Sequence, residues 1–460
     1  MNKENKMGVM PVKKLILTMS LPMMISMLVQ ALYNVVDSIF VSRIAGDSIK
    51  AGEYALTAVS LAFPMQNLMI ALGSGTGVGI NALLSRSLGE KKFEKSNSAA
   101  NMGIHITFIN YLIFLVIGLL FSASFIQRQT DSAVIASYGA TYLRIISCCS
   151  LGLFFQMTFE RLLQSTGKTF YSMISQATGA IINIIFDPLL IFGIGPFPML
   201  GIAGAAIATI LGQFLAASIG LFCNLKYNKE ILISFKQIIK PDFDTIKEIM
   251  FVGFPSILMM SIGSAMTFMI NLILGIFSYT AIAVFGAYFK LQSFFFMPVF
   301  GLNNGLIPVL AYNYGARYKD RIKQALRFAV FLAVSIMVSG TIVFQLIPAT
   351  LIGFFTSSAD SSADLTAIGI PALRIISLSF PVAGLCIALG SVFQAFSKGF
   401  YSLAVSVGRQ LLVLVPVAWL LAQTGILNLV WFAFPIAEVA SLTISVILFR
   451  ILYKNTIATL

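Results

Sequence analysis

Residues 21–42, with the sequence LPMMISMLVQALYNVVDSIFVS, decide the fold of this chain. The stretch is apolar and long enough, as a helix, to cross the roughly 30 Å hydrocarbon core of a membrane. It nevertheless contains a carboxylate. One face of the predicted helix carries four polar side chains at helical spacing, which are Gln30, Tyr33, Asn34 and Asp37.

Asp37 is the unusual member of this face. An acid inside a membrane costs at least about 2.5–3.5 kcal/mol on insertion scales, so it persists where it faces a polar cavity or a partner. We therefore interpret Asp37 as a candidate functional residue. The alternative is a helix–helix hydrogen bond that only holds the bundle together. Pro22, near the start of the stretch, leaves one backbone carbonyl without its helical donor.

The composition of the whole chain agrees with a membrane protein. Of its 460 residues, 58% are hydrophobic and only 10% are charged, whereas soluble proteins are about 25% charged. Mean hydropathy is +0.92. The hydropathy pattern predicts twelve membrane-spanning helices, over residues 15–42, 54–83, 99–122, 135–158, 169–194, 200–224, 247–276, 280–312, 324–348, 364–392, 400–422 and 426–450.

The charges of the predicted loops set the orientation. Alternate loops and both tails hold nearly all the basic residues outside the spans, and the opposite loops hold only Arg43, Lys50 and Arg128. The positive-inside rule then predicts a cell-membrane protein with both termini in the cytoplasm. The same rule accounts for the net charge of +13 without a nucleic-acid partner.

The chain contains an internal repeat. The sequence LRIIS at 143–147 recurs at 373–377, and Lys168 with the FYS at 170–172 recurs at the same offset of 230. An even number of spans in each half predicts two six-helix lobes in parallel orientation. The domains are then 1–224, a linker at 225–246, and 247–460. Such repeats are typical of transporters whose substrate site lies near the middle of the membrane.

A second polar group occupies the fifth predicted span. Asn183 and Asp187 lie one helical turn apart on one face, with Gln176 earlier in the same span. Pro188 cannot donate to the carbonyl of Ile184, so a free oxygen lies beside Asp187. A depth estimate places Asp187 and Asp37 in the same half of the membrane, where they could share one cavity. The alternative is that Asp187 only caps a broken helix before Pro188.

Two chemistries fit these acids. Neighbouring carboxylates titrate as a pair, which suits H⁺, and carboxylate, amide and carbonyl oxygens also suit Na⁺. In the second lobe, Arg409 and Glu438 lie at similar depth on successive spans. They predict a structural ion pair, and a coupling role for Glu438 is the alternative.

Several functions are disfavoured by the sequence. Ser165–Thr169 resembles the end of a phosphate-binding loop, but the required glycine is replaced by Leu162. The four cysteines show no metal-ligand spacing. We therefore expect no ATP dependence, no cofactor beyond a coupling ion, and no enzymatic activity.

These features together resemble the multidrug and toxic compound extrusion (MATE) transporters over nearly the whole chain. The matching features are Leu21-Pro22, the polar face of 30–37 followed by Gly46, Gly89, Asn183-x-x-x-Asp187-Pro188, the run GIAGAAIAT at 201–209, and Gln164 and Lys168 with their copies. The resemblance implies a V-shaped pair of six-helix lobes that alternate between outward-open and inward-open states.

The resemblance also implies a function. Asp37, Asn183, Asp187 and Thr209 would form the cation site of the first lobe, with Gln30, Tyr33, Asn34 and Gln176 nearby. Some members carry further acids in spans 7 and 10, which this chain lacks within those spans, so we expect coupling through the first lobe only. We expect H⁺ rather than Na⁺ as the coupling ion, and amphipathic, often cationic, small molecules as substrates. With Na⁺, the metal ligands would be Asp37, Asn183 and Asp187.

Other functions remain open on the same architecture. A flippase of lipid-linked precursors would need cations in the first lobe, whose interior is acidic. An exporter of an endogenous metabolite is the other alternative. We expect membrane lipid as the surrounding partner and a monomer, because the fold needs no second chain to close its site.

Overall fold

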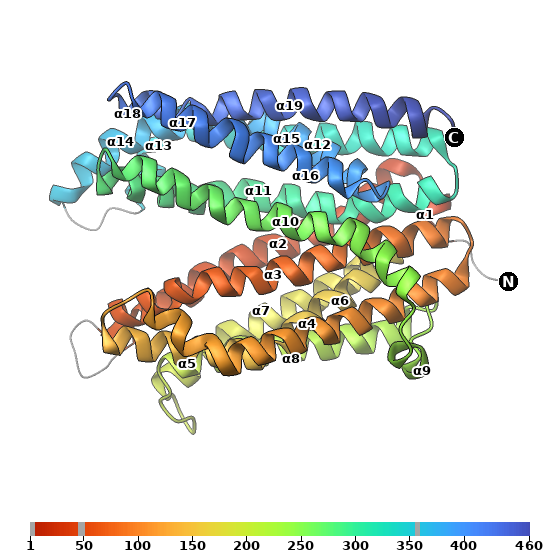
Figure 1. Ribbon diagram of the computed structural model, residues 1–460, viewed down its shortest axis with the longest axis horizontal. Helices are drawn as coiled ribbons and strands as arrows, with labels where there is room; N and C mark the ends of the chain where they lie inside the picture. The colour runs from red at the N-terminus through yellow and green to blue at the C-terminus, as the bar shows by residue number, and fades with distance from the viewer. Residues whose placement is uncertain (1–4, 45–50, 355–358) are drawn as a thin grey trace. The chain divides into compact units, whose positions relative to one another are not determined.

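The computed structural model describes residues 5–44, 51–354 and 359–460 (Figure 1). The described residues form helices joined by short turns. Ten of these helices are long and apolar enough to cross a membrane, or twelve spans result if each of two bent pairs counts as one. The all-α fold predicted from the sequence is confirmed, and the chain is a multi-pass membrane protein.

The helices follow one another along the chain in two similar series. The first series is α1 (Lys6–Val9), α2 (Val12–Ser42), α3 (Ala51–Gly89), α4 (Phe93–Gln127), α5 (Ala133–Cys148), α6 (Leu151–Ser165), α7 (Thr169–Phe192), α8 (Ile202–Tyr227) and α9 (Phe235–Ile239). The second is α10 (Phe243–Gly275), α11 (Tyr279–Gly315), α12 (Lys319–Leu346), α13 (Pro348–Gly353), α14 (Ala359–Ser377), α15 (Phe380–Ala395), α16 (Gly399–Val407), the π-helix η1 (Gly408–Leu414), α17 (Val415–Ala422), α18 (Leu427–Val430), α19 (Ala433–Leu452) and the π-helix η2 (Tyr453–Ile457).

The two bent spans occupy equivalent places in the repeat. α5 and α6 meet at 46°, and residues 364–377 of α14 meet α15 at 47°. The sequence predicts that the fourth span ends at residue 158 and that Arg161 lies in the following loop, but the helix continues to Ser165 and includes Arg161. The prediction ends too early because the charge of Arg161 interrupts the apolar run. Arg161 is only 9% exposed, because its side chain lies against Gly77 and donates to Gln164.

The backbone repeats as well as the sequence. Lys91 and Arg317, at an offset of 226, both have positive φ angles, of 58° and 60°. Gly167 and Ser397, at an offset of 230, also share a positive φ. These unusual angles end a helix with a tight turn in each half. The two-lobe repeat predicted from the sequence therefore extends to the shapes of the turns.

The chain divides into two compact units, Ile25–Ile257 and Met1–Met24 with Leu258–Leu460. The divisions fall within α2 and within α10, whereas the repeat predicts lobes at 1–224 and 247–460. Glycines explain where the first parts of these helices pack. A Cβ on Gly305 of α11 would lie 2.6 Å from the Ser20 hydroxyl, and one on Gly79 of α3 would lie 2.1 Å from the Ile249 carbonyl. The small residues let the helix backbones touch.

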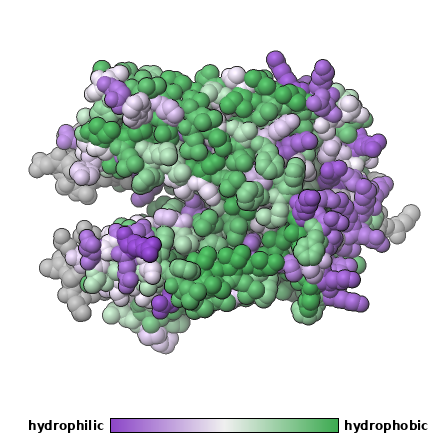
Figure 2. All heavy atoms as spheres, viewed as in Figure 1, coloured by the Kyte–Doolittle hydropathy of each residue, from purple (hydrophilic) through white to green (hydrophobic). Residues whose placement is uncertain are grey.

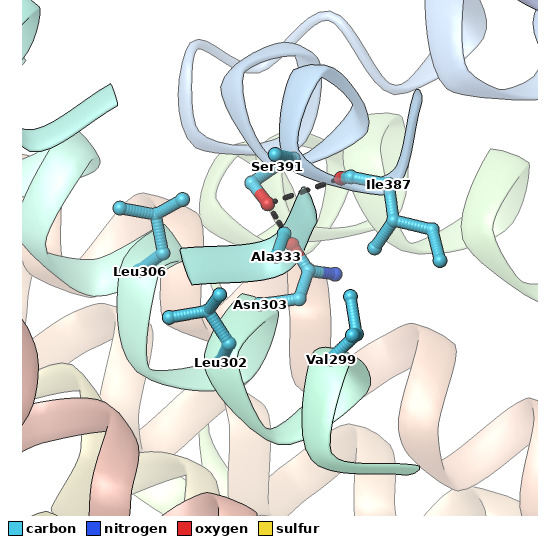
Figure 3. Close-up of a pocket in the computed structure, with 8 residues that line it drawn as sticks. Val299, Leu302, Asn303, Leu306, Ala333, Ile387 and Ser391 are labelled. Atoms are coloured by element: carbon cyan, nitrogen blue, oxygen red, sulfur yellow. Dashed lines mark hydrogen bonds between the residues drawn. The ribbon is translucent and has the colours of Figure 1, made fainter. Parts of the chain in front are cut away.

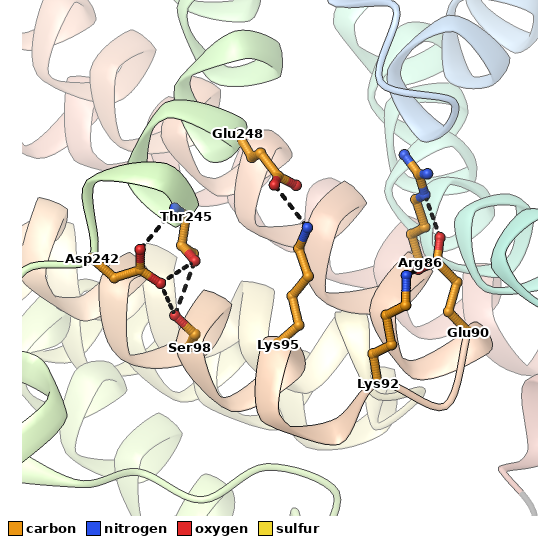
Figure 4. A network of polar contacts seen from close by, with 8 residues as sticks. All are labelled: Arg86, Glu90, Lys92, Lys95, Ser98, Asp242, Thr245 and Glu248. Atoms are coloured by element: carbon orange, nitrogen blue, oxygen red, sulfur yellow. Dashed lines mark hydrogen bonds and ion pairs between the residues drawn. The ribbon is translucent and has the colours of Figure 1, made fainter.

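The start of α10 and the segment before it are held to α4 by polar contacts (Figure 4). Lys95 forms an ion pair with Glu248 at 2.7 Å, and the Ser98 hydroxyl donates to Asp242 at 2.7 Å. Asn101 donates to the carbonyl of Leu232 at 2.9 Å. Figure 2 shows hydrophobic side chains over the middle of the helices and hydrophilic side chains towards their ends. That distribution suits a lipid surround.

Candidate functional site

The structure brings together the two acids singled out from the sequence. Asp37 of α2 and Asp187 of α7 lie within hydrogen-bonding reach of one another. Asp187 is fully buried. When both groups are ionised neither can donate to the other, and the buried Oδ1 of Asp37 has no hydrogen-bond partner among the described residues. A single shared proton would supply the missing donor.

Asn183 and Thr209 complete the polar cluster around Asp187. With its amide nitrogen toward the carboxylate, Asn183 donates to Asp187 Oδ2 at 3.1 Å, and its oxygen accepts from the Thr209 hydroxyl at 3.2 Å. Both residues are buried. The Thr209 hydroxyl also lies 3.0 Å from the carbonyl of Ala205. The cluster therefore joins α7 to α8 through side chains that carry oxygen ligands.

Close packing of α7 on α8 places these groups. A Cβ on Gly212 would lie 2.5 Å from the carbonyl of Gly179, and one on Gly204 would lie 2.4 Å from the carbonyl of Leu190. Only glycine permits this approach. The turn between the helices begins at Gly193, whose φ of +69° is left-handed, and ends with Gly201 donating to Ile191. Small residues on both helices therefore allow the close packing that places Asn183 against Thr209.

Two tyrosines lie near the two acids. Tyr33 of α2 lies close enough to Asp37 and Asp187 for direct electrostatic interaction. Tyr142 of α5 lies near the same two acids and forms a side-chain hydrogen bond with Gln66. Tyr142 and Gln66 were missed as site residues. The one signal in the sequence was that Tyr142 precedes the LRIIS repeat, where the second copy has Ala372.

A further polar contact links α2 to α7. Gln176 donates to Gln30 Oε1 at 2.7 Å, and the buried Ser26 hydroxyl donates to Gln176. Ser26 was not identified from the sequence. By contrast, Asn34 is exposed, whereas Gln30, Tyr33 and Asp37 on the same face of α2 are partly buried. The structure brings the remaining predicted residues of the first half into one region.

The cluster can bind a cation in two ways. Its two carboxyl groups can share and release a proton, or its carboxylate, amide and hydroxyl oxygens can coordinate a small hard cation. Within the described residues no group of three or more His, Cys, Asp or Glu side chains could hold a metal ion. A cation at this site would therefore need oxygen ligands from Asn183, Thr209 or backbone carbonyls as well.

The second half holds a different polar group. Arg409, in the π-helix η1, donates to Glu438 Oε1 of α19 at 2.6 Å. Glu438 is 7% exposed, and its other oxygen has no partner in the described part of the chain. A guanidinium at this distance disfavours a second cation on the carboxylate. The predicted ion pair is therefore present, and its charge balance differs from that of the acids in the first half.

A small apolar pocket lies elsewhere in the second half (Figure 3). Ser391 of α15 donates to Asn303 of α11, and the other lining side chains are aliphatic or small, from Val299, Leu302, Leu306, Ala333, Ile387 and Ala388. The pocket contains no ionisable group. The hydrogen bond between Ser391 and Asn303 links α15 to α11, and the lining of the pocket provides no carboxylate for a cation.

Comparisons with known proteins agree with this geometry. A family model described as MatE matches residues 22–189 and 255–420, which include both acids of the first half. The chain belongs to the MatE family. It is a transporter rather than an enzyme, as predicted.

MatE proteins similar to this chain include two named relatives. The multidrug export protein MepA of Staphylococcus aureus (strain MSSA476) is 26% identical over 453 residues, which cover 98% of this chain and 96% of the relative. MepA of Staphylococcus haemolyticus (strain JCSC1435) is 28% identical over 429 residues, which cover 91% and 89%. The chain therefore matches these MatE relatives over nearly their full length.

Solved structures share the fold. One described as MATE in complex with MaL6 has a TM-score of 0.90 at 24% identity, and covers 98% of both chains. An outward-facing multidrug resistance MATE family transporter of the MOP superfamily has a TM-score of 0.89 at 24% identity, again over 98% of both chains. At this identity the likeness shows the fold alone.

Proposed function

We propose that this MatE transporter exports amphipathic, often cationic, small molecules in exchange for a cation, with H⁺ as the coupling ion rather than Na⁺. The observation that carries the proposal is the contact between the carboxyl groups of Asp37 and Asp187. Two acids held together on different helices bind a proton more readily than either alone. The multidrug export relatives support the substrate class.

Coupling follows from the charge change at this pair. When the pair takes up a proton, the repulsion between α2 and α7 falls and the two helices can pack more closely. α2 is the helix that can respond, because Pro22 lies inside it and leaves a carbonyl without a donor. Binding of the cation would then repack α2 and favour release of the substrate to the outside. Loss of the proton inside the cell would reset the pair.

The placement in the cell is part of the proposal. We place the protein in the cell membrane with both termini in the cytoplasm, and two lobes at 1–224 and 247–460 joined by the segment 225–246. The basic loops on the side of the termini support this orientation. We further propose that the transporter works as a monomer without ATP, surrounded by membrane lipid.

Ethidium efflux from vesicles tests the proposal. A pH gradient and a Na⁺ gradient are imposed separately on wild type, Asp37→Asn and Ser38→Ala. Ser38 is exposed on the same helix, and its hydroxyl donates to the carbonyl of Asn34, so its variant is the matched control. The expected result is efflux driven by the pH gradient in wild type and Ser38→Ala, and loss in Asp37→Asn at equal protein abundance.

Other outcomes have definite meanings. Efflux driven only by Na⁺ would keep the site and change the ion. Normal efflux by Asp37→Asn would contradict the role of the acid pair. Wild-type vesicles that move no dye under either gradient would contradict drug export. A lipid-linked precursor or a metabolite would then be the substrate class to examine.

A further inference from the structure

The turn between α11 and α12 carries an unusual concentration of positive charge. Residues 317–323, RYKDRIK, hold four cations and one acid. Among the described residues, none of these four cations forms an ion pair with a carboxylate. Arg317 is exposed and has a φ of +60°. A surface with this charge attracts anions.

A hollow of about 410 Å³ lies at this turn, lined by Gly8, Arg317, Tyr318, Lys319, Asp320 and Arg321. The walls are fixed by hydrogen bonds. Arg321 donates to the carbonyls of Met7 at 3.0 Å and Met10 at 2.8 Å. Lys319 donates to the carbonyl of Ala458 at 2.6 Å. Arg321 and Lys319 therefore hold the two terminal segments at this turn, and no carboxylate within the described ranges pairs with either side chain.

In the equivalent turn of the first half, one acid pairs with two of the cations (Figure 4). Glu90 forms ion pairs with Arg86 and with Lys92, each at 2.8 Å. The offset of 226 places Ala316 at the position of Glu90 and Arg317 at the position of Lys91. The two turns share their backbone, and Asp320 stands at the position of Glu94, but only the first turn has an acid at position 90. No carboxylate of the described residues pairs with a cation of the second turn, so an external anion can bind there.

The position of the turn identifies the anion. α11, which is long and apolar enough to span a membrane, ends at Gly315, so the hollow lies directly beyond the end of that span. Tyr318 is exposed there, as tyrosines often are at a membrane surface. Phosphate groups of anionic lipids are concentrated at that depth and attract clustered Lys and Arg.

We propose that this hollow binds the phosphate of an anionic phospholipid headgroup. The lipid phosphate would lie beside Arg317 and Lys319, next to Ala316, which stands at the position of Glu90. It would join the α11–α12 turn to the segments around Gly8 and Ala458. The proposal rests on this turn lying at a membrane surface, and not on the transported compound or the coupling ion.

The test measures thermal unfolding and lipid retention of the purified full chain in nanodiscs. Discs of phosphatidylcholine alone are compared with discs that also contain phosphatidylglycerol. We expect phosphatidylglycerol to raise the unfolding temperature of wild type and to remain bound in native mass spectrometry. Arg317→Gln should weaken the binding roughly 5-fold, the effect of one surface cation. Ala316→Glu, which restores the acid of the first half, should abolish it.

Lys91→Gln is the matched control, because Lys91 has the same charge, exposure and φ at the equivalent position. It should keep the full response to phosphatidylglycerol. Equal losses in Lys91→Gln and Arg317→Gln, or no loss in Arg317→Gln and Ala316→Glu, would overturn the proposal. If soluble glycerol phosphate stabilises wild type as well as the lipid does, the assignment to a lipid is wrong. A failure of drug efflux would leave this test unaffected.

Discussion

The two halves of this transporter share a backbone and differ in their buried charges. In the first half Asp37 meets Asp187, and the cluster holds excess negative charge. In the second half Arg409 meets Glu438 and the charges cancel. The segment 411–418 of the second half, LLVLVPVA, is apolar where the repeat places the cluster around Asp187. The repeat therefore determines the framework, whereas the contact between two buried acids is found in the first half and an ion pair stands in the second.

A second pair of positions shows how the same framework accepts different chemistry. Gly77 leaves room for the buried side chain of Arg161 in the first half. At the offsets of 226 and 230, the second half has Asn303 and Ser391, which form a hydrogen bond instead (Figure 3). A large side chain facing glycine is thus exchanged for two small polar ones. Such pairwise exchange preserves helix spacing.

The largest effect should come from the acids of the first half. Asp37→Asn and Asp187→Asn should each abolish cation-driven efflux, because the shared proton needs both carboxyls. The double variant should be no worse than either single one, since residues that act as a unit are not additive. Efflux assays at matched abundance measure this. Additive partial losses would show that the two acids act separately.

The ion pair of the second half should affect stability more than transport. Glu438→Gln leaves Arg409 with its charge uncompensated and should cost about 1.5–3 kcal/mol of unfolding free energy. Arg409→Met/Glu438→Leu removes both charges and should recover most of that loss. Thermal unfolding in detergent measures both. If the double variant is as unstable as the single one, packing rather than charge determines the effect.

The glycine contacts should matter equally in both halves. Gly305→Ala and Gly79→Ala push a methyl group against Ser20 and the carbonyl of Ile249, and each should cost about 1–3 kcal/mol. Gly286→Ala is the control, because a Cβ there has nothing within 4 Å. Unfolding temperatures give the comparison. Losses in one half only would show that the two packing contacts are not equivalent.

The smallest effect concerns the segment before α10. Hydrogen bonds from the hydroxyls of Thr245 and Ser98 hold the pKa of Asp242 below its usual range. Because the unfolded pKa is about 3.9, this stabilisation is complete above about pH 4. It is lost as the pH falls through the lower folded pKa. Because this group is only partly buried and is screened by solvent, the stabilisation amounts to less than about 1 kcal/mol.

Asp242→Asn should therefore lower the unfolding temperature at pH 6 and have a smaller effect at pH 3. The corresponding fastening in the second half uses Arg321 and backbone carbonyls, which do not titrate in this range. Arg321→Gln should accordingly cost the same at both pH values. An equal penalty for Asp242→Asn at pH 6 and pH 3 would contradict the role of its charge.

The sequence was sufficient to predict the helices and the candidate site residues that lie on α2 and α7. Helical spacing and the cost of a buried acid identify Asp37 and Asp187 without any tertiary information. Tyr142 and Ser26 could not be identified in this way, because their roles depend on helices that are distant in sequence. An apolar helix carries many tyrosines and serines, and only the packing determines which of them face an acid.

Charged residues near helix ends were the other source of error. Arg161 was assigned to a loop because its charge ended the apolar run, yet the helix continues to Ser165. Glu160, beside it, is 7% exposed and accepts from Gln156 at 3.0 Å. It was not identified as a buried acid for the same reason. Hydropathy measures the cost of a charge and cannot detect the partners that offset it.

The most direct test of coupling through the first half alone compares one acid from each half. Efflux driven by a pH gradient is measured in vesicles that contain Asp187→Asn or Glu438→Gln, and rates are divided by the amount of folded protein. We predict that Asp187→Asn loses proton-driven efflux and that Glu438→Gln retains it. Retention in Asp187→Asn together with loss in Glu438→Gln would place the coupling site in the second half and contradict the proposed mechanism.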